Sequence, residues 1–511
     1  MPVADQIAAG SLAVFLSLCV VWLVAKQHRG QVANAILVFL TVFVGFGLSA
    51  LLTDQAHAKV TKFIQTDQSE LALRLASACV YAEQYLPGSN TTKSKVSQDM
   101  LAKLMRDTLK DLEQSAAQDP GNINYTAREV ILRHMLDMPI KDAVKALEQP
   151  NNADATKLAK DFSLIYTKPG STSLESALKV EDDLTKFIPN GWYRTSALAS
   201  LYRASEQQGR LDAIKRVDKE NGLALFVRFV CLMCFAAVSF VVGVVVLFVQ
   251  IIFLDRKVTP QQDLPEVRAP AAYGFKAVYA VFITWLAWQL CVSSWSQRYL
   301  HGVQLLQNNV LLAAVMIAGI YLISNVPPLL FAYLFAMRPN KVDFLSGIKL
   351  RLRAGKLGAG KMILAGMMTW FGALPFVLLV QILSVKLLNL KGSTNPIVAL
   401  VMEAARSANL GAILVFYITV SVLAPLCEES LFRGFLYSSL RRKLSIAPSI
   451  LISALLFASV HLDGGAFPAL FVLGAVFAFA FERTKSTVPG MIAHGLWNGG
   501  TFSLVLLLFG N

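Results

Sequence analysis

The sequence is poor in charged residues and lacks the cysteine and histidine spacings of disulfide-rich or zinc-finger proteins. Asp, Glu, Lys and Arg together make up 16% of the 511 residues, whereas 55% are hydrophobic. The six cysteines follow neither a disulfide-framework nor a zinc-knuckle spacing, and no HExxH motif is present. The mean hydropathy of +0.53 is far too high for a soluble protein. We therefore predict a polytopic membrane protein.

Acidic residues are scarcer than basic ones, 33 against 47, which gives a formal net charge of +14. Much of the basic excess lies in short loops between apolar runs, where Lys and Arg set the orientation of membrane helices. We attribute the charge to membrane topology. The expected environment is a lipid bilayer, and no nucleic-acid partner is expected.

The first 52 residues contain two apolar runs but no positively charged segment before the first, so we expect two retained transmembrane helices in residues 1–52. The positive-inside rule places the basic loop between them in the cytoplasm and Thr53 outside. From residue 53 to residue 222 the composition is that of a soluble protein, with apolar residues at helical spacing. We predict an all-helical extracytoplasmic domain over 53–222, which could bind a protein partner.

Apolar runs resume after this domain and alternate with basic loops. Residues 223–400 contain four runs, at roughly 223–254, 271–292, 310–337 and 362–388, and residues 401–511 contain four more. The predicted fold is an all-α bundle of about ten transmembrane helices, multi-pass in the plasma membrane, with the inner membrane of a bacterium as the expected setting. Pro327-Pro328 should break one span, with neighbouring helices satisfying the freed carbonyls.

Two adjacent carboxylates and an arginine interrupt an apolar run near the C-terminus. Glu428, Glu429 and Arg433 lie within what we predict to be one long helix from about residue 410 to 440. Ionisable groups at membrane depth are costly and are functional candidates for that reason. Glu429 and Arg433 are spaced i, i+4 and can form an ion pair. Glu428 projects about 100° away from Glu429 and is free for another role.

Two histidines lie in later apolar runs. His461 closes one run, and His494 lies in the last, where Asn498 shares its helical face. With straight helices, Glu428 and His461 lie about 20 Å and about 22 Å from the cytoplasmic ends of their helices. By the same helical rise His494 and Asn498 lie roughly 9 to 15 Å into the last helix. Three helices thus bring these side chains into the bilayer interior, which predicts one site. The alternative is a structural ion pair with two buried bundle histidines, but the combination favours a functional site.

The residue types point to amide hydrolysis by an activated water. A buried carboxylate beside a histidine can take a proton from water more readily than a solvated one. A histidine and an asparagine on one face can donate hydrogen bonds to the oxyanion that forms when the water attacks a peptide carbonyl. Cys427 could instead act as a nucleophile paired with histidine, but its position as an apolar neighbour of the acidic pair disfavours this.

Three motifs together resemble the signature of the CPBP family, also called Abi, which contains the type II CAAX prenyl endopeptidases. They are Glu428-Glu429-x-x-x-Arg433, Phe457-x-x-x-His461 and His494-x-x-x-Asn498, within a resemblance that covers about residues 410–509. The resemblance implies an intramembrane protease over residues 401–511. In it Glu428 activates water with assistance from His461, His494 and Asn498 stabilise the oxyanion, and Glu429, Arg433 and Phe457 support the site.

Cofactor and substrate follow less directly from these motifs. Glu428, His461 and His494 are ligand types that Zn²⁺ accepts, and the family is often labelled metalloprotease, but the ligands would come from three helices. We expect no obligatory metal and keep zinc as the alternative. The expected substrate is a peptide or a segment of a membrane-associated protein.

Two other functions are compatible with a polytopic bundle. A non-catalytic scaffold or bacteriocin-immunity protein would act through residues 53–222, although intact motifs argue against a degenerate family member. A transporter would also bury charges along its path. No inverted repeat or pair of broken helices supports a transporter.

Overall fold

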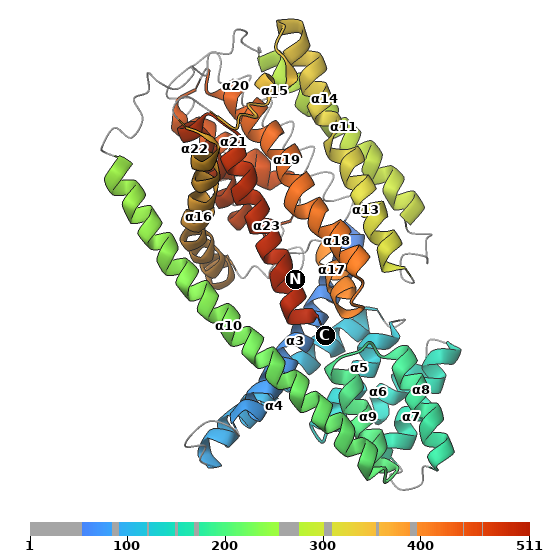
Figure 1. Cartoon of the computed structure of the whole chain (residues 1–511). Coiled ribbons are helices and arrows are strands. Elements are labelled where there is room, and N and C mark those ends of the chain that lie inside the picture. Colours follow the sequence, from blue (N-terminus) through green and yellow to red (C-terminus); the bar gives the residue numbers. More distant parts are fainter. Residues whose placement is uncertain are drawn as a thin grey trace. The chain divides into compact units, whose positions relative to one another are not determined.

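The computed structural model describes residues 54–83, 91–119, 122–148, 152–167, 173–254, 275–300, 309–353, 357–388, 396–442, 444–461 and 463–510. The two apolar runs expected in residues 1–52 lie outside these ranges, as does the loop at 255–269. Helices dominate the described residues and no strand occurs among them (Figure 1), which confirms the all-α prediction. The chain divides into two compact units, whose main parts are residues 61–233 and residues 234–506.

The first unit is a bundle of short helices around one hydrophobic core. Its elements are α3 (Asp54–Glu83), α4 (Thr91–Gln118), α5 (Ile123–Met135), α6 (Lys141–Glu148), α7 (Ala153–Thr167), α8 (Leu174–Phe187), α9 (Trp192–Ala204) and the start of α10 (Gln208–Leu254). The spacing of Met105, Leu109 and Leu112 predicted one buried helix face, and all three are buried in this core.

A buried ion pair fixes α3 to α5 and α9 in this unit. The carboxylate of Glu70 lies 3.3 Å from the guanidinium of Arg128, and both side chains are about 95% buried. Glu70 also accepts a hydrogen bond of 2.9 Å from the backbone N–H of Trp192. A side chain at Gly191 would collide with that carboxylate, and Gly191 has a φ of +157°, which few L-residues adopt. The Gly-Trp start of α9 is therefore determined by Glu70.

The second unit contains the membrane helices. They are the end of α10, α11 (Phe275–Leu300), α13 (Val310–Asn325), α14 (Pro327–Ala332), η1 (Tyr333–Met337), η2 (Arg338–Asn340), α15 (Phe344–Gly347), α16 (Ala359–Leu388), α17 (Pro396–Arg406), a long helix over 410–440, α21 (Ile446–Ser459), α22 (Phe467–Thr484) and α23 (Val488–Phe509). In the described residues six helices are long and apolar enough to span a membrane, and the apolar segments Ala277–Gln289 and Ile446–Ser459 are shorter. Each of the eight apolar runs expected after residue 222 is helical, which confirms a polytopic bundle.

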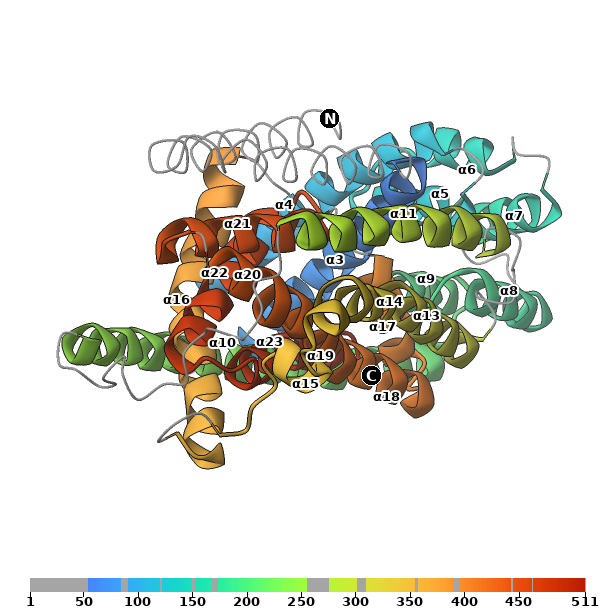
Figure 2. The same cartoon turned by 90° about the horizontal axis from the view of Figure 1, so that it is seen from above.

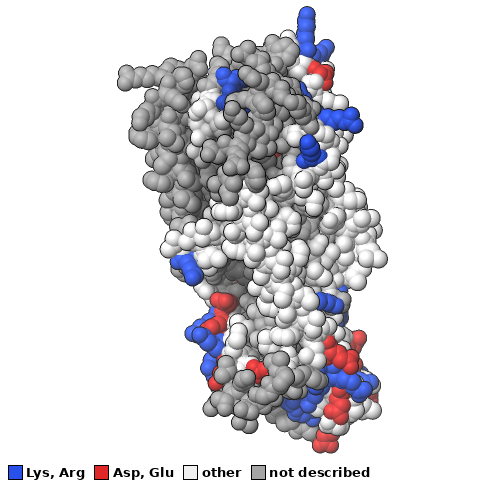
Figure 3. Space-filling view, turned by 60° about the vertical axis from the view of Figure 1, so that its left-hand side comes forward, with Lys and Arg blue, Asp and Glu red and all other residues white. Residues whose placement is uncertain are grey.

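The surface of this unit suits lipid contact. Phe235, Val241 and Phe248 of α10 are each at least 60% exposed. Figure 3 shows a broad uncharged surface, and the coloured Lys, Arg, Asp and Glu atoms lie toward both ends of the view. Apolar side chains exposed in such numbers are stable only against lipid or another apolar surface. Inside the unit, α21 packs on α22, α22 on α16, and α13 on α18, which spans Leu410–Ile418 (Figures 1 and 2).

The break at Pro327-Pro328 occurs as predicted, and a neighbouring helix compensates for it. The two prolines lack the N–H groups that would bond to the carbonyls of Ile323 and Ser324. Trp288 Nε1 of α11 donates to Ile323 O at 2.7 Å. Gln289 Nε2, also of α11, donates to Ser324 O at 3.4 Å. Side chains of α11 thus replace the two missing helix bonds.

The long helix over 410–440 is continuous, as predicted, but it is not uniformly α-helical. It consists of α18 (Leu410–Ile418), the π-helical η3 (Thr419–Leu423), α19 (Ala424–Glu429), the π-helical η4 (Ser430–Tyr437) and α20 (Ser438–Leu440). The two glutamates thus lie at the end of a short α-segment between two π-segments. Such irregular turns are often found at functional sites.

Glu70→Ala should destabilise the first unit by about 3 kcal/mol, because it leaves the Arg128 guanidinium buried without its carboxylate. Hydrogen exchange of the α5 and α9 amides in the full-length protein measures this change. Glu175→Ala is the matched control, because Glu175 pairs with Lys179 at the surface and is 82% exposed. Equal exchange in the two variants would contradict the structural role of Glu70.

Candidate active site

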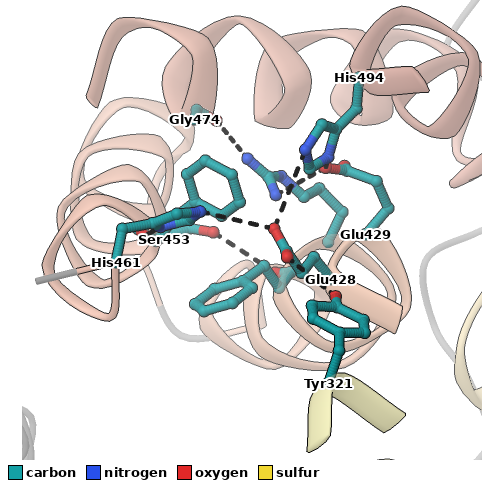
Figure 4. A network of polar contacts seen from close by, with 10 residues as sticks. Tyr321, Glu428, Glu429, Ser453, His461, Gly474 and His494 are labelled. Atoms are coloured by element: carbon teal, nitrogen blue, oxygen red, sulfur yellow. Dashed lines mark hydrogen bonds and ion pairs between the residues drawn. The ribbon is translucent and has the colours of Figure 1, made fainter. Parts of the chain in front are cut away.

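Six of the seven predicted site residues are in contact inside the second unit, among them Glu428, Glu429, His461 and His494 (Figure 4). Asn498 contacts the backbone of the π-segment η3 instead. Glu428 and Glu429 end α19, Arg433 lies in η4, and His494 lies in α23. His461 follows the end of α21 by two residues, so the loop geometry after that helix sets the position of its ring. The structure also adds a residue that we did not predict, Tyr321 of α13.

Glu429 and Arg433 form a fully buried ion pair. Arg433 Nη1 lies 2.8 Å from Glu429 Oε1, and both side chains are 0% exposed. His494 Nδ1 lies 3.1 Å from the same carboxylate oxygen. Arg433 Nη2 donates to the backbone carbonyl of Gly474 in α22 at 3.1 Å. The pair therefore joins the helix over 410–440 to α22 and α23, and the predicted i, i+4 contact is confirmed.

Aromatic rings surround the buried guanidinium. The centre of the Arg433 guanidinium lies 4.3 Å from the ring centroid of Phe457 and 5.3 Å from that of Phe477. His494 stacks on Phe477 with ring centroids 5.3 Å apart. His461 meets Phe457 edge-on at 4.9 Å. Phe457 also meets His494 edge-on at 5.8 Å, so it contacts the cation and both histidines at once, which gives this motif residue a packing role.

Glu428 faces away from the ion pair and toward the two histidines. Its Oε2 lies 3.8 Å from His461 Nε2 and 3.9 Å from His494 Nε2. Its Oε1 accepts a hydrogen bond of 3.0 Å from the hydroxyl of Tyr321. Oε2 is a buried atom with no hydrogen-bond partner in the protein. Glu429 Oε2 is a second buried oxygen without a hydrogen-bond partner, but Glu428 Oε2 is the one that both histidine Nε2 atoms face and that borders a cavity.

The other ring nitrogen of each histidine fixes its tautomer. His461 Nδ1 lies 2.7 Å from the backbone carbonyl of Phe457. A carbonyl can only accept, so Nδ1 carries the proton, and Nε2 of a neutral His461 is a proton acceptor. His494 Nδ1 similarly meets the Glu429 carboxylate that Arg433 holds. His494 can therefore donate from Nε2 only when both of its ring nitrogens are protonated.

Asn498 contacts the backbone of the π-segment η3. The N–H of Ala424 bonds to Thr419 O, five residues back. In that register the next donor would be the N–H of residue 425, which is a proline and has none. Asn498 Nδ2 instead donates to Val420 O at 2.8 Å. The amide thus completes the π-turn before the glutamates, and its second hydrogen is not used by this bond.

A cavity of about 300 Å³ opens beside Glu428 and His461. Trp285 and Gln289 of α11, Tyr321 and Ser324 of α13, and Phe432 are among the residues in its wall. Its volume is at the low end for small-molecule sites. The cavity suits a short stretch of extended chain next to the carboxylate.

Sequence reasoning missed Tyr321 and the cavity. A tyrosine in an apolar run is an ordinary membrane residue. Tyr321 and Glu428 are 107 positions apart in the sequence, and no spacing rule connects residues that far apart. The nearby Pro327-Pro328 break was the only sequence signal that this span differs from its neighbours. It did not indicate which residue would reach the site.

Zinc fits the site by donor type but not by spacing. Zinc binds nitrogen and oxygen ligands at about 2.0–2.2 Å. Over the described ranges, no three His, Cys, Asp or Glu side chains are grouped closely enough to hold a metal ion. The second carboxylate, Glu429, already binds Arg433 and His494 through its Oε1. We therefore route no chemical step through a metal.

Comparisons with known proteins find similarity to membrane peptidases in the part of the chain that holds this site. Residues 410–500 match the model of the family described as type II CAAX prenyl endopeptidase Rce1-like, which confirms the predicted resemblance. This region holds Glu428, Glu429, Arg433, His461, His494 and Asn498.

Two curated bacterial relatives match the same part of the chain. The membrane-embedded CAAX protease MroQ of Staphylococcus aureus (strain USA300) is 32% identical over 91 residues, which are 17% of this chain and 37% of the relative. The protein named "Putative membrane peptidase YdiL" of Bacillus subtilis (strain 168) is 31% identical over 97 residues, 19% of this chain and 39% of the relative. The chain thus spans less than two fifths of either relative. No solved structure matches it.

Arg433→Met should destabilise the membrane unit by about 3 kcal/mol or more, because Glu429 then keeps a buried charge without its main partner. The double variant Glu429→Gln with Arg433→Met should recover part of that loss. Thermal unfolding of the purified protein in detergent compares the two. A double variant no more stable than Arg433→Met would contradict the buried ion pair.

Proposed function

We propose that this protein is an intramembrane endopeptidase that hydrolyses a peptide bond with a water activated by Glu428. The observation that supports this most directly is the geometry at Glu428 Oε2, a buried acceptor without a partner that faces the Nε2 atoms of two histidines at 3.8 Å and 3.9 Å. These gaps exceed a direct hydrogen bond and suit a water between the groups. The matched peptidase family supports the same reaction class.

In this proposal Glu428 is the general base. The water binds at Oε2, loses a proton to the carboxylate and attacks the scissile carbonyl. Tyr321 keeps Oε1 occupied by its 3.0 Å hydrogen bond, so the other oxygen faces the water. His461, whose Nε2 is an acceptor in the neutral ring, orients the water. Glu428 then returns the proton to the leaving amine.

His494 supplies the oxyanion contact in this scheme. It donates from Nε2 in its doubly protonated form, while Glu429 accepts from Nδ1. Asn498 has a second amide hydrogen available beside its bond to Val420 O. Glu429 and Arg433 have a positioning role, because they hold the His494 ring and the end of α19.

We propose a peptide or a membrane-associated protein segment as the substrate. We also propose that residues 53–222 face the extracytoplasmic side of the plasma membrane, where this unit could bind a protein partner. A second function, a non-catalytic scaffold acting through that unit, would leave the geometry at Glu428 without a role. The peptidase is therefore the stronger proposal.

Glu428→Gln should lower cleavage of a membrane-proteome peptide mixture by at least about 100-fold, because it removes the general base and keeps the shape of the side chain. Glu403→Gln is the matched control, since Glu403 is an exposed glutamate on α17. Mass spectrometry of the products measures both. Cleavage by the Glu428→Gln protein at the rate of the wild type would contradict the proposal.

Cleavage should persist after prolonged treatment with a strong chelator, because the proposed mechanism uses no metal. The same peptide mixture is digested by chelated and untreated wild-type protein. Loss of activity that added Zn²⁺ restores would instead assign a metal to Glu428, His461 and His494.

A further inference from the structure

The break in the helix next to Tyr321 frees the backbone carbonyl of Ser324, a residue that lines the cavity. Pro328 has no N–H, so Ser324 O has no partner one turn further along the helix. Its contact to Gln289 Nε2 is long, at 3.4 Å. Both Gln289 and Ser324 line the cavity that contains Glu428. A carbonyl oxygen has two lone pairs, so Ser324 O can accept a second and stronger hydrogen bond.

A substrate of an intramembrane peptidase needs such an acceptor. A peptide bond inside a helix is shielded, so the substrate must unwind before water can attack it. Unwinding exposes N–H groups that must be satisfied inside the membrane, since each unpaired one costs several kcal/mol. Extended peptides commonly meet this need by pairing their backbone with that of the protein that binds them.

The carbonyl freed by the neighbouring proline is bonded differently from that of Ser324. Pro327 frees Ile323 O, but Trp288 Nε1 closes that carbonyl with a bond of 2.7 Å. Ile323 is not among the lining residues of the cavity. Of the two freed carbonyls, that of Ser324 has the weaker bond, and Ser324 is the one that lines the cavity with Glu428.

We propose that Ser324 O binds a backbone N–H of an extended substrate segment, and that Gln289 yields to it or shares the oxygen with it. This inference rests on the proposed peptidase function and adds that recognition at this point depends on the main chain. The remaining cavity wall, with Trp285 and Phe432, accommodates apolar side chains. The substrate class is therefore an apolar peptide segment in extended conformation.

The test uses binding to the Glu428→Gln protein, so that it does not depend on turnover. The probe is a short dansyl-labelled peptide of alternating leucine and alanine, together with a series of versions that each replace one backbone N–H by an ester oxygen. One ester position should weaken binding about fivefold, the effect of one lost hydrogen bond. Fluorescence titration in detergent measures the affinities.

Two proline variants locate the acceptor. Pro328→Ala restores a helical N–H to Ser324 O, so the amide and ester peptides should bind it equally. Pro327→Ala makes the same change one residue earlier and should keep the fivefold difference. Gln289→Leu removes the competing donor and should also keep the difference.

Each outcome decides the proposal. The proposal is overturned if each ester weakens binding to the Pro327→Ala protein and to the Pro328→Ala protein by the same factor. It is also overturned if no form of the protein binds the amide peptide, because main-chain recognition does not require particular side chains. Ester-sensitive binding without cleavage by the wild type would keep this inference and refute the peptidase. Cleavage without any ester effect would do the reverse.

Discussion

The buried ion pair between Glu429 and Arg433 is the interaction on which the site depends. Both side chains are completely buried, and two charges removed from water are stabilised by each other and by further hydrogen bonds from their neighbours. Here His494 and the Gly474 carbonyl provide contacts from α23 and α22. The requirement to satisfy this pair therefore fixes the relative positions of three helices, and the position of Glu428 follows from theirs.

Adjacent glutamates have different environments because they lie on different sides of one helix. Glu429 is held by a cation and a histidine and has no exposed surface. Glu428 is 15% exposed on its side chain and borders a cavity. Glu429 is fixed in an ion pair and is a poor base, whereas Glu428 borders the cavity and can bind and deprotonate water there. Because successive residues project about 100° apart on a helix, Glu429 has the supporting role and Glu428 the reactive one.

Irregular backbone in this bundle is matched by side chains from neighbouring helices. Asn498 bonds to Val420 O in the π-segment that precedes the glutamates, and Trp288 and Gln289 bond to the carbonyls that Pro327 and Pro328 leave free. Without water in the bilayer core, each such carbonyl needs a partner from the protein. The irregular turns lie around Glu428. In a regular helix the backbone carbonyls there would bond within the helix and would not be available to other groups.

The sequence by itself determined the helical membrane bundle, the Pro327-Pro328 break and the Glu429–Arg433 contact. Each follows from local rules: apolar run length, the missing N–H of proline and the i, i+4 spacing. The matched depths of Glu428 and His461 also indicated one site.

Only the tertiary structure decided which atoms meet there. It added Tyr321, gave Asn498 a backbone partner and set the His461 tautomer through Phe457 O. These outcomes depend on the rotation and packing of helices far apart in the chain and on π-turns that shift the register. How each helix rotates and packs depends on all of its neighbours, so it cannot be predicted from any single segment of the sequence.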